Sequence, residues 1–314
     1  MTTHSISPHR ATLHGTFSPT WPAVLTIEPG DTVVFETLDA RWTIGDPPDD
    51  HTLGATFAPK DPERDNGRAL CGPIAIDGAE PGMVLAVEIG ELVPGPHGWT
   101  VGGGWSNGIN ERLSMQDEEL LLSWQIDHGE GVAIDQFGRS VELRPFFGVM
   151  GMPRTSTVPV PSWTPRPQDG NIDCKELSAG TTLFLPIAVP GGLFSAGDGH
   201  ARQGDGEVSS TAIECPFASA ALTFSLRSDL ALTTPIAWTP DAWITFGFDE
   251  DLDEAVIIAL DAMLDLMGRE HGLARTQGLA LASVVADLRI TQIVNGVRGV
   301  HMVLRHDAIG GLDA

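Results

Sequence analysis

Residues 24–37, VLTIEPGDTVVFET, place a tight turn between two short apolar segments. Apolar and polar residues alternate in both segments, which is the pattern of a half-buried strand. Pro29 and Gly30 occupy the second and third positions of the turn. A type II turn needs a fixed φ at the second position and a positive φ at the third. The stretch therefore predicts two strands joined as a β-hairpin.

The same pattern recurs further along the chain. Residues 73–89, PIAIDGAEPGMVLAVEI, again place a Pro-Gly turn between two alternating segments and predict a second hairpin. Residues 181–200 predict a strand, a turn at PGG and another strand, and residues 210–227 predict one or two more strands. The sequence up to about residue 230 is therefore expected to be mostly β.

Three polar or proline-rich segments separate these strands. Residues 45–70 and 93–108 are expected to be long irregular loops, and loops of that length usually carry function or move. Residues 152–171 contain five prolines, which exclude a helix or a central strand. We expect this segment to wrap over the surface and to mark a boundary between parts of the chain.

The pattern becomes helical near residue 250. Apolar residues at three- and four-residue spacing predict an amphipathic helix over residues 251–273, with Gly272 as its stop. A second helix is expected over residues 275–286. Residues 287–305 then predict a hairpin with Asn295-Gly296 in a type I′ turn. We thus expect an α+β part at residues 231–314, after a β part at 1–150 and a second β segment at 151–230.

Composition narrows the possible partners and locations. The 314 residues carry a formal net charge of −24, which disfavours nucleic acids and anionic membranes because both would be repelled. The sequence contains neither an apolar stretch long enough for a membrane span nor an N-terminal secretion signal. We therefore expect a cytoplasmic protein whose three widely spaced cysteines are reduced thiols.

Residues 197–207, GDGHARQGDGE, concentrate possible ligands between glycines. Residues two apart share a face of an extended segment, so Asp198 should point with His200, and Asp205 with Glu207. A turn between the pairs would bring them face to face. Carboxylates and an imidazole around one point suit a divalent metal that lowers the pKa of a bound water. The competing interpretation is a glycine-rich turn with solvated carboxylates.

Several longer blocks resemble the acetamidase/formamidase family. They are NIDCKEL at 171–177, LFLPIAVPGGLFSAGDGHARQGDGEVSSTAIE at 183–214, RPFFGVMG at 144–151, and the segments around residues 24–40, 247–264 and 292–304. The resemblance spans nearly the whole chain in the same order. It implies a β-sandwich-like, jelly-roll-type body and a hydrolase that converts formamide- or acetamide-type amides to ammonia and a carboxylate. It also suggests a bound divalent metal, for which zinc is the first candidate and calcium the second.

The resemblance extends to individual residues, to which we assign roles from their chemistry. Arg68 stands where relatives frequently have a histidine, and Met83 where they frequently have an aspartate. A fixed cation near the pocket would favour a substrate that carries a carboxylate, or would simply lie on the rim. We expect catalysis by Glu207 and Asp205, substrate binding by Asn171 and Arg68, and metal binding by Asp173, Asp198 and His200, with Asp205 as an additional or alternative ligand.

Three other functions remain compatible with the residues. The chain could be a non-catalytic metal- or ligand-binding β module, a related protein that holds calcium only for structure, or a hydrolase of lactams or urea-like compounds. A blue-copper site is disfavoured, because no histidine follows Cys215 closely. We expect the protein to form a homo-oligomer, and a dimer is the expected form.

Overall fold

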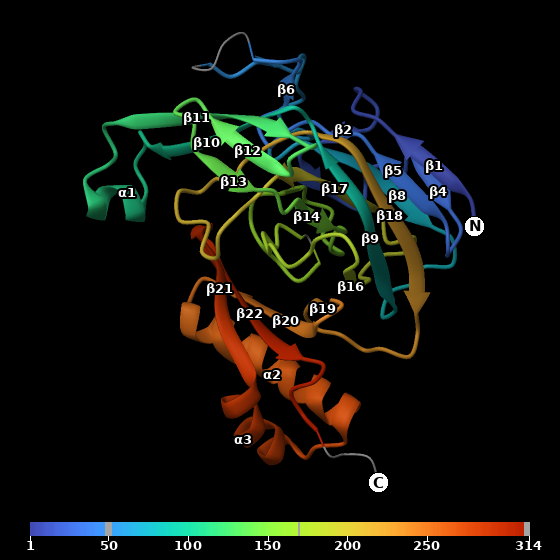
Figure 1. The fold of residues 1–314 in the computed structure, drawn as a ribbon. Coiled ribbons are helices and arrows are strands. Elements are labelled where there is room, and N and C mark those ends of the chain that lie inside the picture. The colour runs from blue at the N-terminus through green and yellow to red at the C-terminus, as the bar shows by residue number, and fades with distance from the viewer. Residues whose placement is uncertain (48–51, 169, 311–314) are drawn as a thin grey trace.

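The fold is built around two β-sheets that pack face to face (Figure 1). The computed structural model describes residues 1–47, 52–168 and 170–310. The larger sheet has nine strands in the order β1-β5-β18-β9-β16-β19-β20-β22-β21. Its strands are β1 (Thr3–Ile6), β5 (Thr32–Phe35), β18 (Phe217–Arg227), β9 (Val84–Pro94), β16 (Thr182–Pro186), β19 (Ile236–Trp238), β20 (Ala242–Asp249), β22 (Val297–Arg305) and β21 (Ala286–Asn295).

The second sheet covers one end of the first. Its path is β14-β17-β8-β2, and β4 also pairs with β8. Aromatic side chains from both sheets meet in the layer between them. The ring of Phe35 lies 6.3 Å from that of Phe147 and 6.5 Å from that of Phe194, all three fully buried. The strands of this sheet are β14 (Phe146–Gly151), β17 (Phe194–His200), β8 (Leu70–Ile76), β2 (Leu13–His14) and β4 (Leu25–Ile27).

The mostly β architecture with a β-sandwich-like body is confirmed, but both predicted hairpins are wrong. β4 joins the smaller sheet while β5 joins the larger one, and β8 and β9 divide in the same way. The turns themselves form as predicted, with Gly30 and Gly82 at φ of 97° and 91°. Unprimed turns splay their flanking strands, whereas two-residue hairpins need the primed types. Each turn is therefore an arch from one sheet to the facing one.

The C-terminal part agrees closely with its prediction. Helix α2 (Leu252–His271) begins at the cap Asp251 and ends at Gly272 in the left-handed conformation, and α3 (Arg275–Val285) follows. Figure 1 shows both helices beside the β20–β22–β21 end of the large sheet. The β21–β22 hairpin is confirmed, but its type I′ turn is not, because Asn295 has no positive φ. Instead the Gln292 side chain accepts hydrogen bonds from the backbone at 294 and 295.

The expected loops are only partly irregular. Residues 93–108 contain β10 (His97–Gly103), so the prediction of an irregular segment is wrong there. A four-stranded sheet and the short helix α1 (Gly108–Leu113) follow, and the sequence analysis did not anticipate them. Strand β10 pairs with β11 (Glu119–Asp127), and β12 (Val132–Asp135) and β13 (Ser140–Glu142) complete that sheet.

The other two loop predictions hold in the described residues. Residues 45–70, of which 48–51 lie outside the described part, contain β7 (Ala55–Thr56), which pairs with β6 (Thr43–Ile44), and end at the first residue of β8. Residues 152–171, where 169 is outside the described part, contain only the short β15 (Val160–Pro161), which pairs with β3 (Thr16–Phe17). The division at residues 150 and 230 stays a prediction.

The helices of the structure can be compared with the requirements of a membrane span. Among the residues described, no helix combines the length and apolar content that a membrane span requires.

A buried histidine in the small sheet predicts a pH-dependent stability. His14 contacts Thr16 O at 2.9 Å and Ser195 Oγ at 2.9 Å, and burial lowers its pKa from 6.5 to about 4. An unfolded chain takes up a proton between these pH values and the folded chain does not, so the free energy of unfolding falls as pH falls through that window. His14 should contribute a loss of about 3 kcal/mol. Urea unfolding of wild type and His14→Gln across the window measures it, and equal slopes in both proteins would contradict it.

Candidate active site

Two carboxylates and one imidazole meet where β17 ends. Asp198 and His200 lie two residues apart on this strand, both about 1% exposed, and Asp198 Oδ1 lies 3.6 Å from His200 Nε2. The same His200 Nε2 lies 3.3 Å from Oε2 of the fully buried Glu214. The Phe146 ring stands edge-on to the imidazole at 5.0 Å between centroids. The prediction that Asp198 and His200 point together is confirmed.

Two further carboxylates approach His200 from loops. Oxygen atoms of Asp173 and Glu207 and a His200 ring nitrogen all lie within 4.8 Å of one another. Asp173 comes from the segment before β16, and its Oδ2 accepts hydrogen bonds from Asn171 Nδ2 at 2.9 Å and Asn295 Nδ2 at 3.1 Å. Asp173 and Glu207 therefore form a second group of possible ligands, which shares His200 with the group on β17.

Arg68 supplies a positive charge beside Asp198. Its Nε lies 3.7 Å from Asp198 Oδ2, and its side chain is 20% exposed. Burial alone would lower the pKa of this guanidinium, but the surrounding carboxylates, Asp198 first, raise it above its ordinary value. Arg68 therefore stays charged and partly balances the carboxylates.

Asp205 does not join this cluster. Its Oδ2 forms an ion pair with Lys175 Nζ at 2.6 Å, and its side chain is 33% exposed. Glu207, two residues on, is only 4% exposed and turns inward. The extended conformation predicted for Asp205 and Glu207 is wrong, because Gly206 and Glu207 have φ of 93° and 46° and the segment is a turn rather than a strand.

The cluster holds more buried negative charge than its cations balance. Burial raises the pKa of Asp173 to about 7 and that of Glu207 well above its usual range. Burial would also raise the pKa of Asp198, but Arg68 and His200 lower it. Burial would lower the pKa of His200, but the carboxylates of Glu214 and Asp198 raise it well above its ordinary value. A cation placed among these groups would stabilise the ionised carboxylates.

Many polar atoms of the cluster lack a hydrogen-bond partner. Buried atoms of this kind are normally satisfied, so a group of them is suited to bind an ion, water or substrate. The atoms are Arg68 Nε, Asn171 Oδ1, Asp173 Oδ1, Asp198 Oδ1, His200 Nδ1 and Nε2, Gln203 Oε1, Glu207 Oε2 and Glu214 Oε2.

The backbone around the cluster is held in uncommon conformations. Asn171, Asp173, Asp198 and Glu207 have positive φ between 46° and 60°, and they are four of the eight non-glycine residues with positive φ in the described chain. Such conformations are rare outside glycine and concentrate at functional sites. This clustering agrees with the unsatisfied polar atoms in marking the same place.

Gly148 of β14 leaves the space that the cluster occupies. A Cβ atom there would lie 2.7 Å from Asp173 Oδ1, 2.8 Å from His200 Cε1 and 3.0 Å from Asp198 Oδ2. Gly148→Ala should therefore displace these side chains and lower the free energy of unfolding by about 1–3 kcal/mol. Urea denaturation measures the loss. Gly102→Ala is the matched control, because a Cβ at that β10 position meets nothing within 4 Å, and an equal loss in both variants would contradict the prediction.

Two pockets reach the cluster from the surface. One has a volume of about 260 Å³ and is lined by Trp124, Arg202, Asp205, Glu207 and others. The other has a volume of about 420 Å³ and is lined by Trp42, Lys60, Arg68, Trp163 and others. Glu207, Gln203 and Arg68 are thus the cluster residues that line these pockets.

The sequence analysis missed three residues of the site. Glu214 is preceded and followed by apolar residues in TAIECPF, and an acid in such a run was the only local signal for it. Gln203, whose Nε2 donates to Asp173 O at 2.7 Å, lies inside the glycine-rich motif and was passed over. Asn295 lies far away in sequence, and only the fold brings it to Asp173.

Comparison with known proteins gives one consistent result. The family model described as "Acetamidase/Formamidase family" matches residues 2–160 and 153–303. A Schizosaccharomyces pombe protein with a formamidase name is 27% identical, over 76% of this chain and 73% of that protein. The acetamidase of Mycolicibacterium smegmatis is 26% identical, over 62% of this chain and 61% of its own length. The crystal structure of an acetamidase from Bacillus halodurans has a TM-score of 0.83 and 26% identity, and it covers 96% of this chain and 97% of its own.

Proposed function

Because the chain belongs to the acetamidase/formamidase family and is an amidase by that membership, we propose that it hydrolyses short linear amides. The C–N bond of a primary amide breaks, one water is consumed, and a carboxylate and ammonia are released. The observation that carries the proposal is the buried cluster around His200, with its unsatisfied polar atoms and its opening beside Glu207.

We further propose that Asp173, Asp198 and His200 hold a divalent cation, with Glu214 close to Asp198 at the same imidazole nitrogen. The residues fit such an ion, because Asp198 with Glu214 and Asp173 with Glu207 form two groups of possible ligands that share His200. Each of these five residues also has a buried polar atom without a hydrogen bond, and together they carry excess negative charge. One imidazole with carboxylates suits zinc, whereas calcium prefers a larger all-oxygen shell. When bound, such an ion supplies Lewis acidity and a water that ionises near neutral pH.

Glu207 is proposed as the group that moves the proton. It lies within reach of His200 and Asp173 and borders the pocket. Its raised pKa suits a carboxylate that must accept a proton and later return it to the leaving nitrogen, because proton transfer is most efficient near the working pH. Ammonia is a better leaving group than the amide anion, so this return is required for bond cleavage.

Arg68 and Asn171 are proposed to orient the substrate. Asn171 uses its Nδ2 to donate to Trp163 O at 2.9 Å and to Asp173, which leaves Oδ1 free to accept from an amide N–H. Arg68 offers Nε, which makes no hydrogen bond, to the carbonyl oxygen. Asp205 has no part in this scheme because its carboxylate pairs with Lys175.

Release of ammonia from a panel of amides tests the proposal. We expect formamide or acetamide to release ammonia faster than longer primary amides and urea-like compounds do. They should also be hydrolysed faster than lactams, whose ring opening releases no ammonia and is measured by the amino acid that forms. A short amide that also carries a carboxylate tests the alternative suggested by Arg68. If no amide of the panel releases ammonia, with or without added zinc, the proposed activity is wrong and a binding function becomes the better interpretation. The expected dimer and the cytoplasmic location stay predictions.

A further inference from the structure

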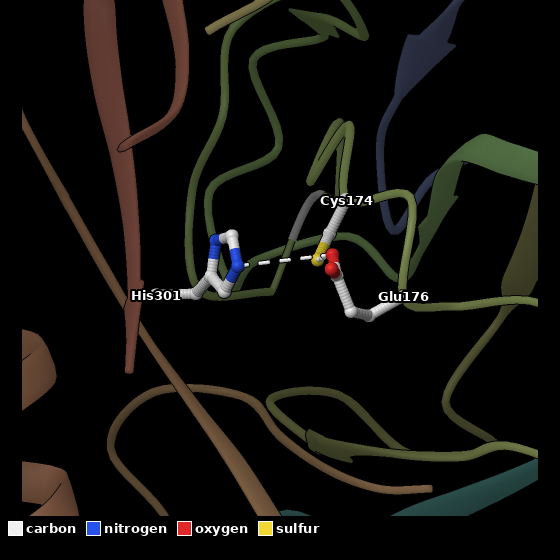
Figure 2. Close-up of side chains that lie close together, drawn as sticks. All are labelled: Cys174, Glu176 and His301. Carbon is white, nitrogen blue, oxygen red and sulfur yellow. Dashed lines mark hydrogen bonds and ion pairs between the residues drawn. The ribbon is translucent and has the colours of Figure 1, made fainter. Parts of the chain in front are cut away.

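A second cluster of metal-binding residue types lies beside the candidate active site without sharing a residue with it. Cys174 and Glu176 come from the segment before β16, and His301 comes from β22. Sγ, a carboxylate oxygen and a ring nitrogen of the three all lie within 4.8 Å of one another. Figure 2 shows the three side chains pointing toward one another from these two parts of the chain.

The three side chains are enclosed. Cys174 is 1% exposed, His301 is fully buried, and the Glu176 side chain is 9% exposed. The Cys174 thiol donates to Glu176 Oε2 at 3.3 Å, while His301 Nε2 lies 3.7 Å from the same oxygen and makes no hydrogen bond. A fully buried ring nitrogen with no hydrogen bond, aimed at a carboxylate and a sulfur, points to an absent ligand.

Hydrogen bonds from outside the cluster hold the other polar atoms of His301 and Glu176 in place. His301 Nδ1 is hydrogen-bonded to Thr291 Oγ1 at 2.8 Å, so Nε2 is the nitrogen left to face inward. Arg289 Nη1 holds Glu176 Oε1 at 3.2 Å, which leaves Oε2 for the cluster. Outer partners of this kind orient the ligands in metal sites. The competing interpretation is a purely structural cluster, in which the buried Glu176 carboxylate accepts hydrogen bonds from Cys174 and Arg289 and binds no metal.

We propose that Cys174 Sγ, Glu176 Oε2 and His301 Nε2 bind a zinc ion at a site distinct from the His200 cluster. Sulfur, imidazole nitrogen and carboxylate oxygen are the zinc ligand types. On binding, the Cys174 S–H bond breaks, its proton passes to solvent, and the sulfur donates an electron pair to the ion. The ion would link the segment that carries Asp173 to the C-terminal hairpin, which also reaches Asp173 through Asn295.

Cobalt tests the proposal, because only a cysteine ligand gives Co²⁺ a thiolate charge-transfer band in the near ultraviolet. The full-length protein is purified from cells grown with added Co²⁺, and its absorption spectrum and metal content are measured. Wild type should show the band, and Cys174→Ser should lose both the band and one equivalent of metal per chain. Cys71→Ser is the matched control, since Cys71 is also a buried free cysteine, its thiol donates to Glu36 O at 3.3 Å, and it belongs to none of the groups of possible metal ligands among the described residues.

A second variant keeps the test decisive if Cys174→Ser does not fold. His301→Gln retains the thiol and should also lose one equivalent of metal, with the band abolished or strongly reduced. A variant of the other cluster, His200→Gln, should keep the band in full. No band in wild type, or a band that survives Cys174→Ser, would overturn the site. Neither outcome bears on amide hydrolysis, which is measured separately.

Discussion

Glu207→Gln is expected to lower kcat for the preferred amide by roughly 10²- to 10⁴-fold, the usual contribution of a positioned acid or base. Glutamine keeps the size and the buried position of the side chain but cannot accept and return a proton. Because the change removes only this chemistry, KM should change far less than kcat. Steady-state measurement of ammonia release on both proteins gives the two constants.

Asp205→Asn is the matched control for this variant. It makes the same carboxylate-to-amide change two residues away, at a partly exposed ion pair with Lys175. Exposed ion pairs contribute about 0–1 kcal/mol, so the variant should fold and keep most of its activity. If Glu207→Gln works at the wild-type rate, Glu207 is not the proton carrier. A larger loss in Asp205→Asn would give Asp205 the catalytic role expected from the sequence.

The glycine-rich motif shows how far spacing predicts geometry. Asp198 and His200 lie together in β17, as the two-residue rule predicts for a strand, although Asp198 itself has a positive φ of 60°. The rule fails for Asp205 and Glu207 because the strand ends at His200 and a turn separates their side chains. A short sequence cannot reveal where a strand ends when glycines permit either conformation.

The rest of the site depends on contacts between distant segments. Gly148, Glu214 and Asn295 come from three separate parts of the chain, and no spacing relates them. The clearest case is Asn295, which the sequence analysis used only as a turn residue although its Nδ2 donates to Asp173. Contacts of this kind follow from the arrangement of the sheets, which local patterns do not specify.

The arches explain why local patterns fell short. The EPG turns at Gly30 and Gly82 were predicted correctly, and so were the strands beside them, yet the strands pair elsewhere. Strand β4 finds its partner in β8, and β5 finds its partners in β1 and β18. Turn residues determine the backbone at the turn, whereas the partner of a strand depends on which apolar faces can be buried together. Helices α2 and α3 needed no distant partner to be recognised, so they were predicted to within about two residues.

Removal of divalent metal is expected to lower amide hydrolysis by at least about 10³-fold, because a water that ionises near neutral pH is lost with the ion. Added zinc should restore the activity of chelator-treated wild type. It should also raise the midpoint of thermal unfolding, since a ligand that binds only the folded state stabilises it. This second readout does not depend on turnover.

His200→Gln connects that effect to the cluster. Without any chelator treatment, the variant should already be as inactive as metal-free wild type. Added zinc should not raise its activity, because His200 is the residue that both ligand groups share. His128→Gln makes the same change at an exposed position in the turn between β11 and β12 and should respond to chelation and zinc as wild type does. Full activity of a wild-type sample that elemental analysis shows to be metal-free would contradict a metal role. In that case the unsatisfied atoms around His200 would have to be explained by water and substrate alone, with Arg68 as the cation that stabilises the developing charge.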